Sequence, residues 1–379
     1  MQVKTLKTYF KSYKESSLEG RYIHTDKIRS LLNSEDLKPF IKAIGYSVNN
    51  ELIYSITIGS GSKKVLMWSQ MHGNESTTTK AVFDILNLLL ADEVLSKSIL
   101  MHCTLKIIPI LNPDGAKAYT RLNANNIDLN RDAQDLSQPE SQVLRREFEL
   151  FKPDFCFNLH GQRTIFSVGN TNYPATVSFL APAQDIECTV TSTRKIAMEL
   201  ITIMNTTLQE QIFGQIGIYD DAFNSNCVGD TFQSMNVPTI LFEAGHFTND
   251  YYREVTREYI FQSLLIAIYH ISNHDIDGKS YSGYFAIPEN RKLFYDIIIR
   301  NTSKLDIGIV YVEKLINNTI HFIPKIEKIS DLSSFFAHRE IDANGYEVFS
   351  AENNQLKAQS ENDFVLINNE KISLKLKKN

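Results

Sequence analysis

Residues 65–75 have the sequence VLMWSQMHGNE, and this stretch contains the most informative pattern of the chain. The apolar run Val65–Trp68 is typical of a buried strand. It is followed by His72 and Glu75, an imidazole and a carboxylate three positions apart. In a parallel α/β sheet, such a strand brings two metal-binding side chains into one space beyond its carboxyl end. Two ligands do not complete a metal site, so the prediction depends on what other strands bring to the same edge.

Strand-like and helix-like segments alternate along most of the chain. The predicted strands are residues 51–59, 64–69, 105–111, 154–159 and 238–242. The predicted helices are residues 77–91, 197–211 and 254–270, and a further helix that starts within residues 137–140 and runs to about Phe151. This alternation predicts an α/β fold with a mostly parallel sheet. Ligands in such folds bind beyond the carboxyl ends of the strands.

The character of the chain changes after about Asp275. A linker-like segment at residues 277–280 is followed by short β-rich runs separated by turns. Since 379 residues are many for one domain, we predict a large domain over residues 1–277 and a small, mainly β C-terminal domain over residues 278–379.

The composition is that of a folded protein, with 43% hydrophobic and 22% charged residues. The net charge of −5 gives no reason to expect nucleic acid or an anionic membrane as a partner. The four cysteines are widely spaced, and Cys103 and Cys156 lie in apolar runs, which predicts buried thiols and not a disulfide framework. Because the first residues lack the apolar core of a signal peptide and no uncharged run reaches transmembrane length, we expect a cytoplasmic protein.

Two further predicted strands end in residues with the same chemistry, His160 and Glu243. Two histidines and a glutamate, with the fourth position open, are the ligand set of a catalytic zinc ion. The metal lowers the pKa of a water molecule at the open position. Glu243 is then a candidate to accept the proton of that water and to pass it to a leaving amine.

Residues 121–131, with the sequence RLNANNIDLNR, are rich in fixed hydrogen-bond donors. Arginine binds carboxylates through two parallel hydrogen bonds. Arg121 and Arg131 beside a metal would suit an anionic substrate and a developing oxyanion.

Five motifs occur in the order found in zinc carboxypeptidases, and residues 45–270 resemble the carboxypeptidase A-like family. The motifs are His72-Gly73-Asn74-Glu75, Asn112-Pro113-Asp114-Gly115, Asp128-Leu129-Asn130-Arg131, the strand-end His160 and Phe242-Glu243. The resemblance implies a mixed, mostly parallel sheet flanked by helices. It also implies one Zn²⁺ per chain, held by His72, Glu75 and His160.

The resemblance further implies roles for the other candidate residues. Arg121 would polarise the scissile carbonyl and stabilise the oxyanion. Asn130 and Arg131 would bind the terminal carboxylate of the substrate. Glu243 would be the general base and acid. Tyr219, which stands about two dozen positions before this glutamate, would be the mobile tyrosine of the site.

We therefore expect a zinc metallocarboxypeptidase that removes a C-terminal residue from peptides. An acyl-amino-acid deacylase similar to succinylglutamate desuccinylase or aspartoacylase is an alternative, and a murein-peptide amidase is a second. The turn at residues 112–115 and Tyr219 favour the carboxypeptidase. A binding protein on an inactivated peptidase scaffold is a third alternative. If the protein is one of these enzymes, we expect its substrate to be a peptide or acyl-amino acid with a free carboxylate. The sequence carries no signal of oligomeric state.

Overall fold

The computed structural model describes residues 1–376, and the chain forms two compact units. The first unit consists of Met1–Gln162 and Ala175–Asn290, and the second consists of Arg163–Pro174 and Arg291–Asn379. The predicted domains, residues 1–277 and 278–379, stay a prediction, because compactness alone does not test independent folding.

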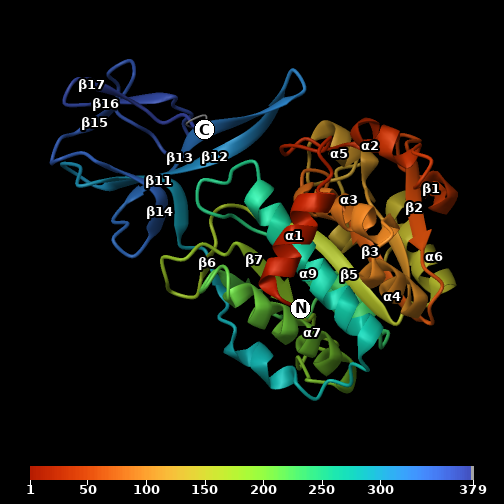
Figure 1. The fold of residues 1–379 in the computed structure, drawn as a ribbon. Coiled ribbons are helices and arrows are strands. Elements are labelled where there is room, and N and C mark those ends of the chain that lie inside the picture. The colour runs from red at the N-terminus through yellow and green to blue at the C-terminus, as the bar shows by residue number, and fades with distance from the viewer. Residues whose placement is uncertain (377–379) are drawn as a thin grey trace. The chain divides into compact units, whose positions relative to one another are not determined.

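The first unit is built on an eight-stranded sheet with the order β1-β2-β4-β3-β5-β9-β7-β8 (Figure 1). Its strands are β1 (Ile41–Tyr46), β2 (Leu52–Ile58), β3 (Lys63–Ser69), β4 (Cys103–Ile108), β5 (Phe155–Gly161), β7 (Val177–Leu180), β8 (Ile216–Ile218) and β9 (Thr239–Ala244). The central strands β4, β3, β5 and β9 are parallel, whereas β1, β2 and β4 pair in antiparallel fashion, as do β9 and β7. The predicted mixed, mostly parallel sheet is therefore confirmed.

Helices connect these strands and cover both faces of the sheet. They are α1 (Val3–Tyr13), α2 (Thr25–Leu32), α3 (Thr77–Leu90), α4 (Val94–His102), α5 (Pro113–Ala118), α6 (Pro139–Phe151), α7 (Ser192–Gln209), α8 (Val228–Ser234) and α9 (Glu254–Asn273), with short 3-10 turns at η1 (Lys38–Phe40), η2 (Leu129–Arg131) and η3 (Tyr281–Ala286). Among residues 1–376, none of the helices is both long enough and apolar enough to cross a bilayer.

The core has two layers because successive side chains of a strand point to opposite faces of the sheet. In β3, Val65 and Met67 pack into a cluster with apolar residues of α1, α3, α7 and α9. Leu66 and Trp68 pack on the other face, with residues of α6 and α8. Figure 1 shows α1, α3 and α9 close together, and these three helices contact one another. Side chains on both faces of β3 therefore hold the strand in the sheet. The loop that carries His72 begins where β3 ends, at Ser69.

The turn predicted at residues 112–115 is wrong. The sequence predicts a turn at residues 112–115, but a helix, α5, begins there. Asn112 caps this helix, because its side-chain oxygen accepts a hydrogen bond from the amide of Gly115 at 2.8 Å. Asparagine followed by proline opens both turns and helices, which explains the error.

The prediction for the cysteines is confirmed, since all four thiols are free and both Cys103 and Cys156 are buried.

The second unit consists mainly of β-strands. These are β6 (Ser167–Val168), β11 (Phe294–Arg300), β12 (Asp306–Ile316), β13 (Thr319–Ser330), β14 (Phe336–Asp342), β15 (Val348–Ser350), β16 (Phe364–Ile367) and β17 (Glu370–Ser373). They form a four-stranded sheet, β13-β12-β11-β14, and a three-stranded sheet, β15-β16-β17, while β6 pairs with the short strand β10 (Asn290–Arg291). The mainly β character that the sequence predicts for the C-terminal part is thus observed.

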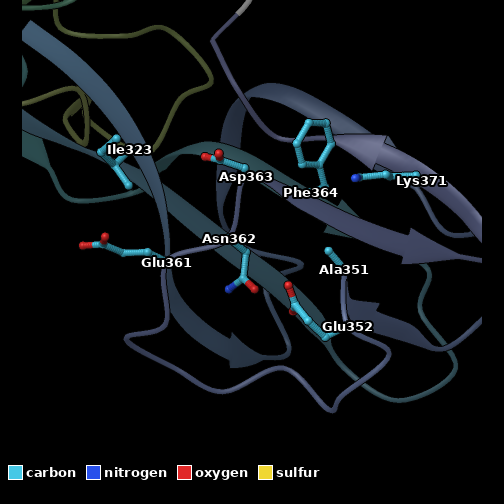
Figure 2. Close-up of a pocket in the computed structure, with 8 residues that line it drawn as sticks. All are labelled: Ile323, Ala351, Glu352, Glu361, Asn362, Asp363, Phe364 and Lys371. Atoms are coloured by element: carbon cyan, nitrogen blue, oxygen red, sulfur yellow. The ribbon is translucent and has the colours of Figure 1, made fainter.

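A pocket of about 540 Å³ lies in the second unit (Figure 2). It is lined by Ile323, Ala351, Glu352, Glu361, Asn362, Asp363, Phe364 and Lys371. Its carboxylates already have partners within the protein. Glu361 pairs with Lys314 at 2.6 Å, Asp363 pairs with Lys375 at 2.8 Å, and Glu352 accepts from the hydroxyl of Ser350 at 2.9 Å. The candidate site residues predicted from the sequence all lie in the first unit.

Candidate active site

His72, Glu75 and His160 converge at the carboxyl ends of β3 and β5, which are neighbours in the sheet (Figure 1). Their ligand atoms all lie within 4.8 Å of one another. The two carboxylate oxygens of Glu75 lie 3.0 Å from Nδ1 of His72 and 3.0 Å from Nδ1 of His160. The two Nδ1 atoms are 3.1 Å apart. Two imidazole nitrogens and a carboxylate that face one another are the donor set of a catalytic zinc ion, so these residues fit the metal.

The loop that carries His72 and Glu75 depends on a glycine. A Cβ atom on Gly73 would lie 1.9 Å from the carbonyl carbon of Gly115. No side chain is compatible with this approach of two backbones. The glycine between the two ligands therefore allows the loop to pack tightly against α5.

Asp128 holds the far side of the His72 ring. Nε2 of His72 donates to Oδ1 of Asp128 at 3.0 Å, and Nε of Arg121 donates to Oδ2 of Asp128 at 3.1 Å. A carboxylate that accepts from one ring nitrogen fixes the tautomer and leaves the other nitrogen free to bind a metal. Asp128 is the first residue of the Asp-x-Asn-Arg motif, so a signal was present in the sequence, although no role was assigned to it.

Burial and the neighbouring charges set the protonation states of this cluster. Burial alone would lower the pKa of His72, but the carboxylates of Glu75 and Asp128 raise it. Burial alone would raise the pKa of Glu75, yet His72 and His160 lower it. The pKa of Asp128 is also lowered, since the hydrogen bond and charge of His72 and the charge of Arg121 outweigh burial. Burial lowers the pKa of His160. Both carboxylates are therefore ionised at neutral pH, which favours a cation in this space.

Glu243 lies on β9, the next strand of the sheet, directly opposite His160 in the parallel register. Its Oε2 atom is buried and has no hydrogen-bond partner within the described part of the chain, residues 1–376. Burial, and secondly the charge of Glu75, raises the pKa of Glu243 well above its usual value. A buried carboxyl group with a raised pKa is a candidate for proton transfer.

Arg121, Asn130 and Arg131 lie on the chain that follows α5. The side chain of Arg121 is 46% exposed, and its Nη1 atom donates to Oε1 of Glu75 at 3.3 Å. Oδ1 of Asn130 accepts from the amide of Val228 at 3.1 Å. Arg131 is exposed, and its Nη1 atom donates to the carbonyl of Asn130 at 2.7 Å and to Sγ of Cys227 at 3.0 Å. The structure thus brings Arg121 to the ligand cluster and places Asn130 and Arg131 together beside α8.

Tyr219 follows β8, and its hydroxyl group donates to Oε1 of Gln162 at 2.6 Å. Gln162 is buried and stands two residues after His160. Tyr219 is therefore hydrogen-bonded to the residue that follows β5, the strand that carries the candidate ligand His160.

The family model for zinc carboxypeptidases matches residues 28–149. Over these residues, the chain is similar to the zinc carboxypeptidase family. The matched segment contains His72, Glu75, Arg121, Asn130 and Arg131, whereas His160, Tyr219 and Glu243 lie beyond it.

Individual relatives agree with this family. The chain is 29% identical over 115 residues to a probable carboxypeptidase 2 of Trichophyton verrucosum, a match that covers 30% of this chain and 21% of the relative. The chain thus spans about a fifth of the length of that relative.

Solved structures show the same fold. A putative carboxypeptidase A from Shewanella denitrificans OS-217 is 19% identical, with a TM-score of 0.54, over 65% of this chain and 68% of that one. The carboxypeptidase A of Helicoverpa armigera is 15% identical, with a TM-score of 0.53, over 71% of this chain and 80% of that one.

Two further residues, Gln162 and Arg253, lie at the same strand ends and were not predicted. The guanidinium of Arg253 is buried and donates to the carbonyl of Ala244 at 3.1 Å and to the carbonyl of Gln162 at 3.0 Å. It therefore joins Ala244, the residue after Glu243, to Gln162, which stands two residues after His160. No local motif marks either residue, because their partners are distant in the sequence.

Proposed function

We propose that this protein is a zinc-dependent hydrolase that removes a C-terminal residue from peptides. The observation that carries the proposal is the convergence of His72, Glu75 and His160, with Glu243 opposite His160 on the neighbouring strand. The buried Oε2 atom of Glu243 has no hydrogen-bond partner among residues 1–376. The first three residues supply the donors of a catalytic metal, and the fourth supplies a proton acceptor that is not needed as a ligand.

One zinc ion per chain would be held by the two Nδ1 atoms and the carboxylate of Glu75, because this is the one such group among residues 1–376. When bound, zinc would polarise the scissile carbonyl and lower the pKa of a water molecule. Asp128 would keep His72 in the tautomer that has Nδ1 free.

Glu243 would accept a proton from the attacking water and then donate it to the departing amine. Burial raises the pKa of Glu243, which makes its carboxylate a stronger proton acceptor than an exposed one. Arg121 would stabilise the negative charge that develops on the carbonyl oxygen, since its guanidinium already reaches the carboxylate of Glu75.

Asn130 and Arg131 would bind the free carboxylate of the substrate. Arginine is suited to this role because its planar guanidinium makes paired hydrogen bonds to a carboxylate. Tyr219 would contact the bound substrate from the end of β5, where Gln162 holds its hydroxyl group. A substrate that lacks the terminal carboxylate would lose the contacts with Asn130 and Arg131.

A substrate panel tests the proposal. Purified protein loaded with zinc is incubated with peptides, with acyl-amino acids and with muropeptides, and the products are identified by mass spectrometry. Release of single C-terminal amino acids from peptides supports the proposal. Cleavage of acyl-amino acids without such release would assign a deacylase instead, and cleavage of muropeptides alone would assign a murein-peptide amidase.

Glu75→Ala tests whether the cluster binds zinc. It removes the one carboxylate that faces both histidines, and we expect it to bind far less zinc than the wild-type protein. Unchanged metal content in this variant, together with an absence of zinc from the wild-type protein, would support a binding protein on an inactivated scaffold.

A further inference from the structure

Four polar residues that flank the His72–Glu75 motif on both sides are completely shielded from solvent. Ser69 and Gln70 precede the motif, Thr78 and Thr79 follow it, and each has an exposed fraction of 0%. Burying a polar group is costly unless it is hydrogen-bonded. None of these side chains takes part in the chemistry proposed above. Their burial next to the candidate ligands therefore needs another explanation.

Gln70 fixes the backbone between the two ligands of the loop. Its Nε2 group donates to the carbonyl of Gly73 at 2.7 Å and to the carbonyl of Ile23 at 3.0 Å. Its Oε1 atom accepts from the hydroxyl of Thr79 at 2.8 Å. Gly73 directly follows His72, so the amide of Gln70 determines how the chain leaves this ligand.

The hydroxyl groups extend this network to the second histidine. Oγ of Ser69 lies 2.8 Å from Oγ1 of Thr78 and 2.8 Å from Oγ1 of Thr79. Thr78 also donates to the carbonyl of Leu159 at 3.4 Å, and Leu159 directly precedes His160. Each hydroxyl proton has an acceptor, and a fully satisfied buried network is rigid.

The network also includes the N-terminal segment of the chain. Ile23, whose carbonyl accepts from Gln70, lies before residue 28, where the match to the family model begins. Two residues earlier, the carbonyl of Arg21 accepts from the hydroxyl of Ser76, the residue after Glu75. This segment therefore contacts the ligand loop on both sides of its metal-binding residues.

We propose that Gln70, together with the hydroxyls of Ser69, Thr78 and Thr79, is a positioning element that sets the two histidine ligands in place before the metal binds. The proposal rests on the proposed function, because it takes His72 and His160 as ligands. Its physical basis is preorganisation: a ligand set that is already rigid loses less conformational entropy when it binds a metal. The network therefore acts through the histidines, and no member of it contacts the metal.

Gln70→Met tests the proposal, since it keeps the length of the side chain and removes its donors and its acceptor. Changes in groups that orient ligands weaken metal binding by about 10- to 100-fold. We expect zinc to transfer from this variant to a chromophoric chelator about 10- to 100-fold faster than from the wild-type protein. We also expect the visible spectrum of the Co²⁺-loaded variant to be shifted or broadened.

Gln262→Met is the matched control. Gln262 has an exposed fraction of 0% and its amide bonds to Glu258 and Gln211, so the same change removes a buried amide network away from the ligands. We expect a fall in melting temperature but a wild-type rate of zinc transfer. If Gln70→Met loses stability like the control and also keeps the wild-type rate of transfer, the inference is overturned.

Thr79→Val and Thr79→Ser decide the question if Gln70→Met does not fold. The valine variant keeps the shape and loses the hydroxyl, whereas the serine variant keeps the hydroxyl. The network is supported if zinc transfers faster from the valine variant but not from the serine variant. Equal rates of transfer from the two variants overturn the inference. If the wild-type protein itself binds no zinc, it is the proposed function that fails.

Discussion

Asp128→Asn is the substitution for which the structure gives the clearest magnitude. Oδ1 of Asp128 accepts from His72 at 3.0 Å and from the amide of Asn130 at 2.9 Å, while Oδ2 accepts from Arg121 at 3.1 Å. Asparagine has a single acceptor oxygen. If this oxygen faces His72, the new amide group points at the guanidinium of Arg121, and the opposite orientation places two donors together at His72.

The loss amounts to at least one hydrogen bond that involves a charged group. Such bonds contribute about 1.5–3 kcal/mol, which corresponds to about 10- to 150-fold in an equilibrium constant. We expect the dissociation constant for zinc to rise by about 10- to 100-fold, since His72 loses the group that fixes its tautomer. The turnover of the fully zinc-loaded variant should fall less than its metal affinity.

Competition with a fluorescent chelator at pH 7.5 measures this constant. Asp132→Asn is the control, because this buried carboxylate accepts from Ser137 and Gln138. It should leave the zinc affinity unchanged. A dissociation constant within about twofold of the wild-type value for Asp128→Asn would refute the reasoning.

Three further predictions concern proton transfer, substrate binding and stability. Glu243→Gln should retain zinc and lose about 10²- to 10⁴-fold in kcat; near-wild-type turnover would remove Glu243 from its role as base. Arg131→Met should raise KM by about tenfold or more for peptides with a free terminal carboxylate, with a much smaller effect on kcat, because it removes a substrate contact; an unchanged KM for these peptides in steady-state assays would exclude the contact. Burial raises the pKa of Asp230 from 3.8 to about 6. This raised pKa favours the fold below pH 3.8, and the contribution is lost as the pH rises through about 6. Asp230→Asn should therefore stabilise the protein at pH 8, by at most about 3 kcal/mol, and have little effect at pH 4; equal melting-temperature shifts at the two pH values would contradict this.

The strands that build the site could be predicted because each is a short apolar run followed by a chemically distinctive residue. His72 follows β3, while His160 and Glu243 lie near the carboxyl ends of β5 and β9. Parallel strands bring these ends to one edge of the sheet. No pattern in the sequence predicted α4, because its apolar residues are not confined to one face and Val94 and Met101 are exposed. The expectation of a cytoplasmic protein without nucleic-acid or membrane partners stays a prediction.

The groups that support the ligands were not predicted, because their roles depend on contacts between distant parts of the chain. Arg253 donates to a carbonyl 91 positions away, and the carbonyl of Ile23 lies 47 positions from the amide that binds it. Periodicity and local motifs contain no information on such pairs. Asp128 is the exception, since it stands within a recognisable motif.

The most direct test of the central claim is the release of C-terminal amino acids from a defined set of peptides by the zinc-loaded protein, followed by mass spectrometry. Each peptide is supplied with a free terminal carboxylate and, in parallel, with a terminal amide. The account predicts that single residues are released from the free-carboxylate peptides alone, and that a chelator or Glu75→Ala abolishes the release. Unchanged peptides, in a preparation shown to contain zinc, would contradict it.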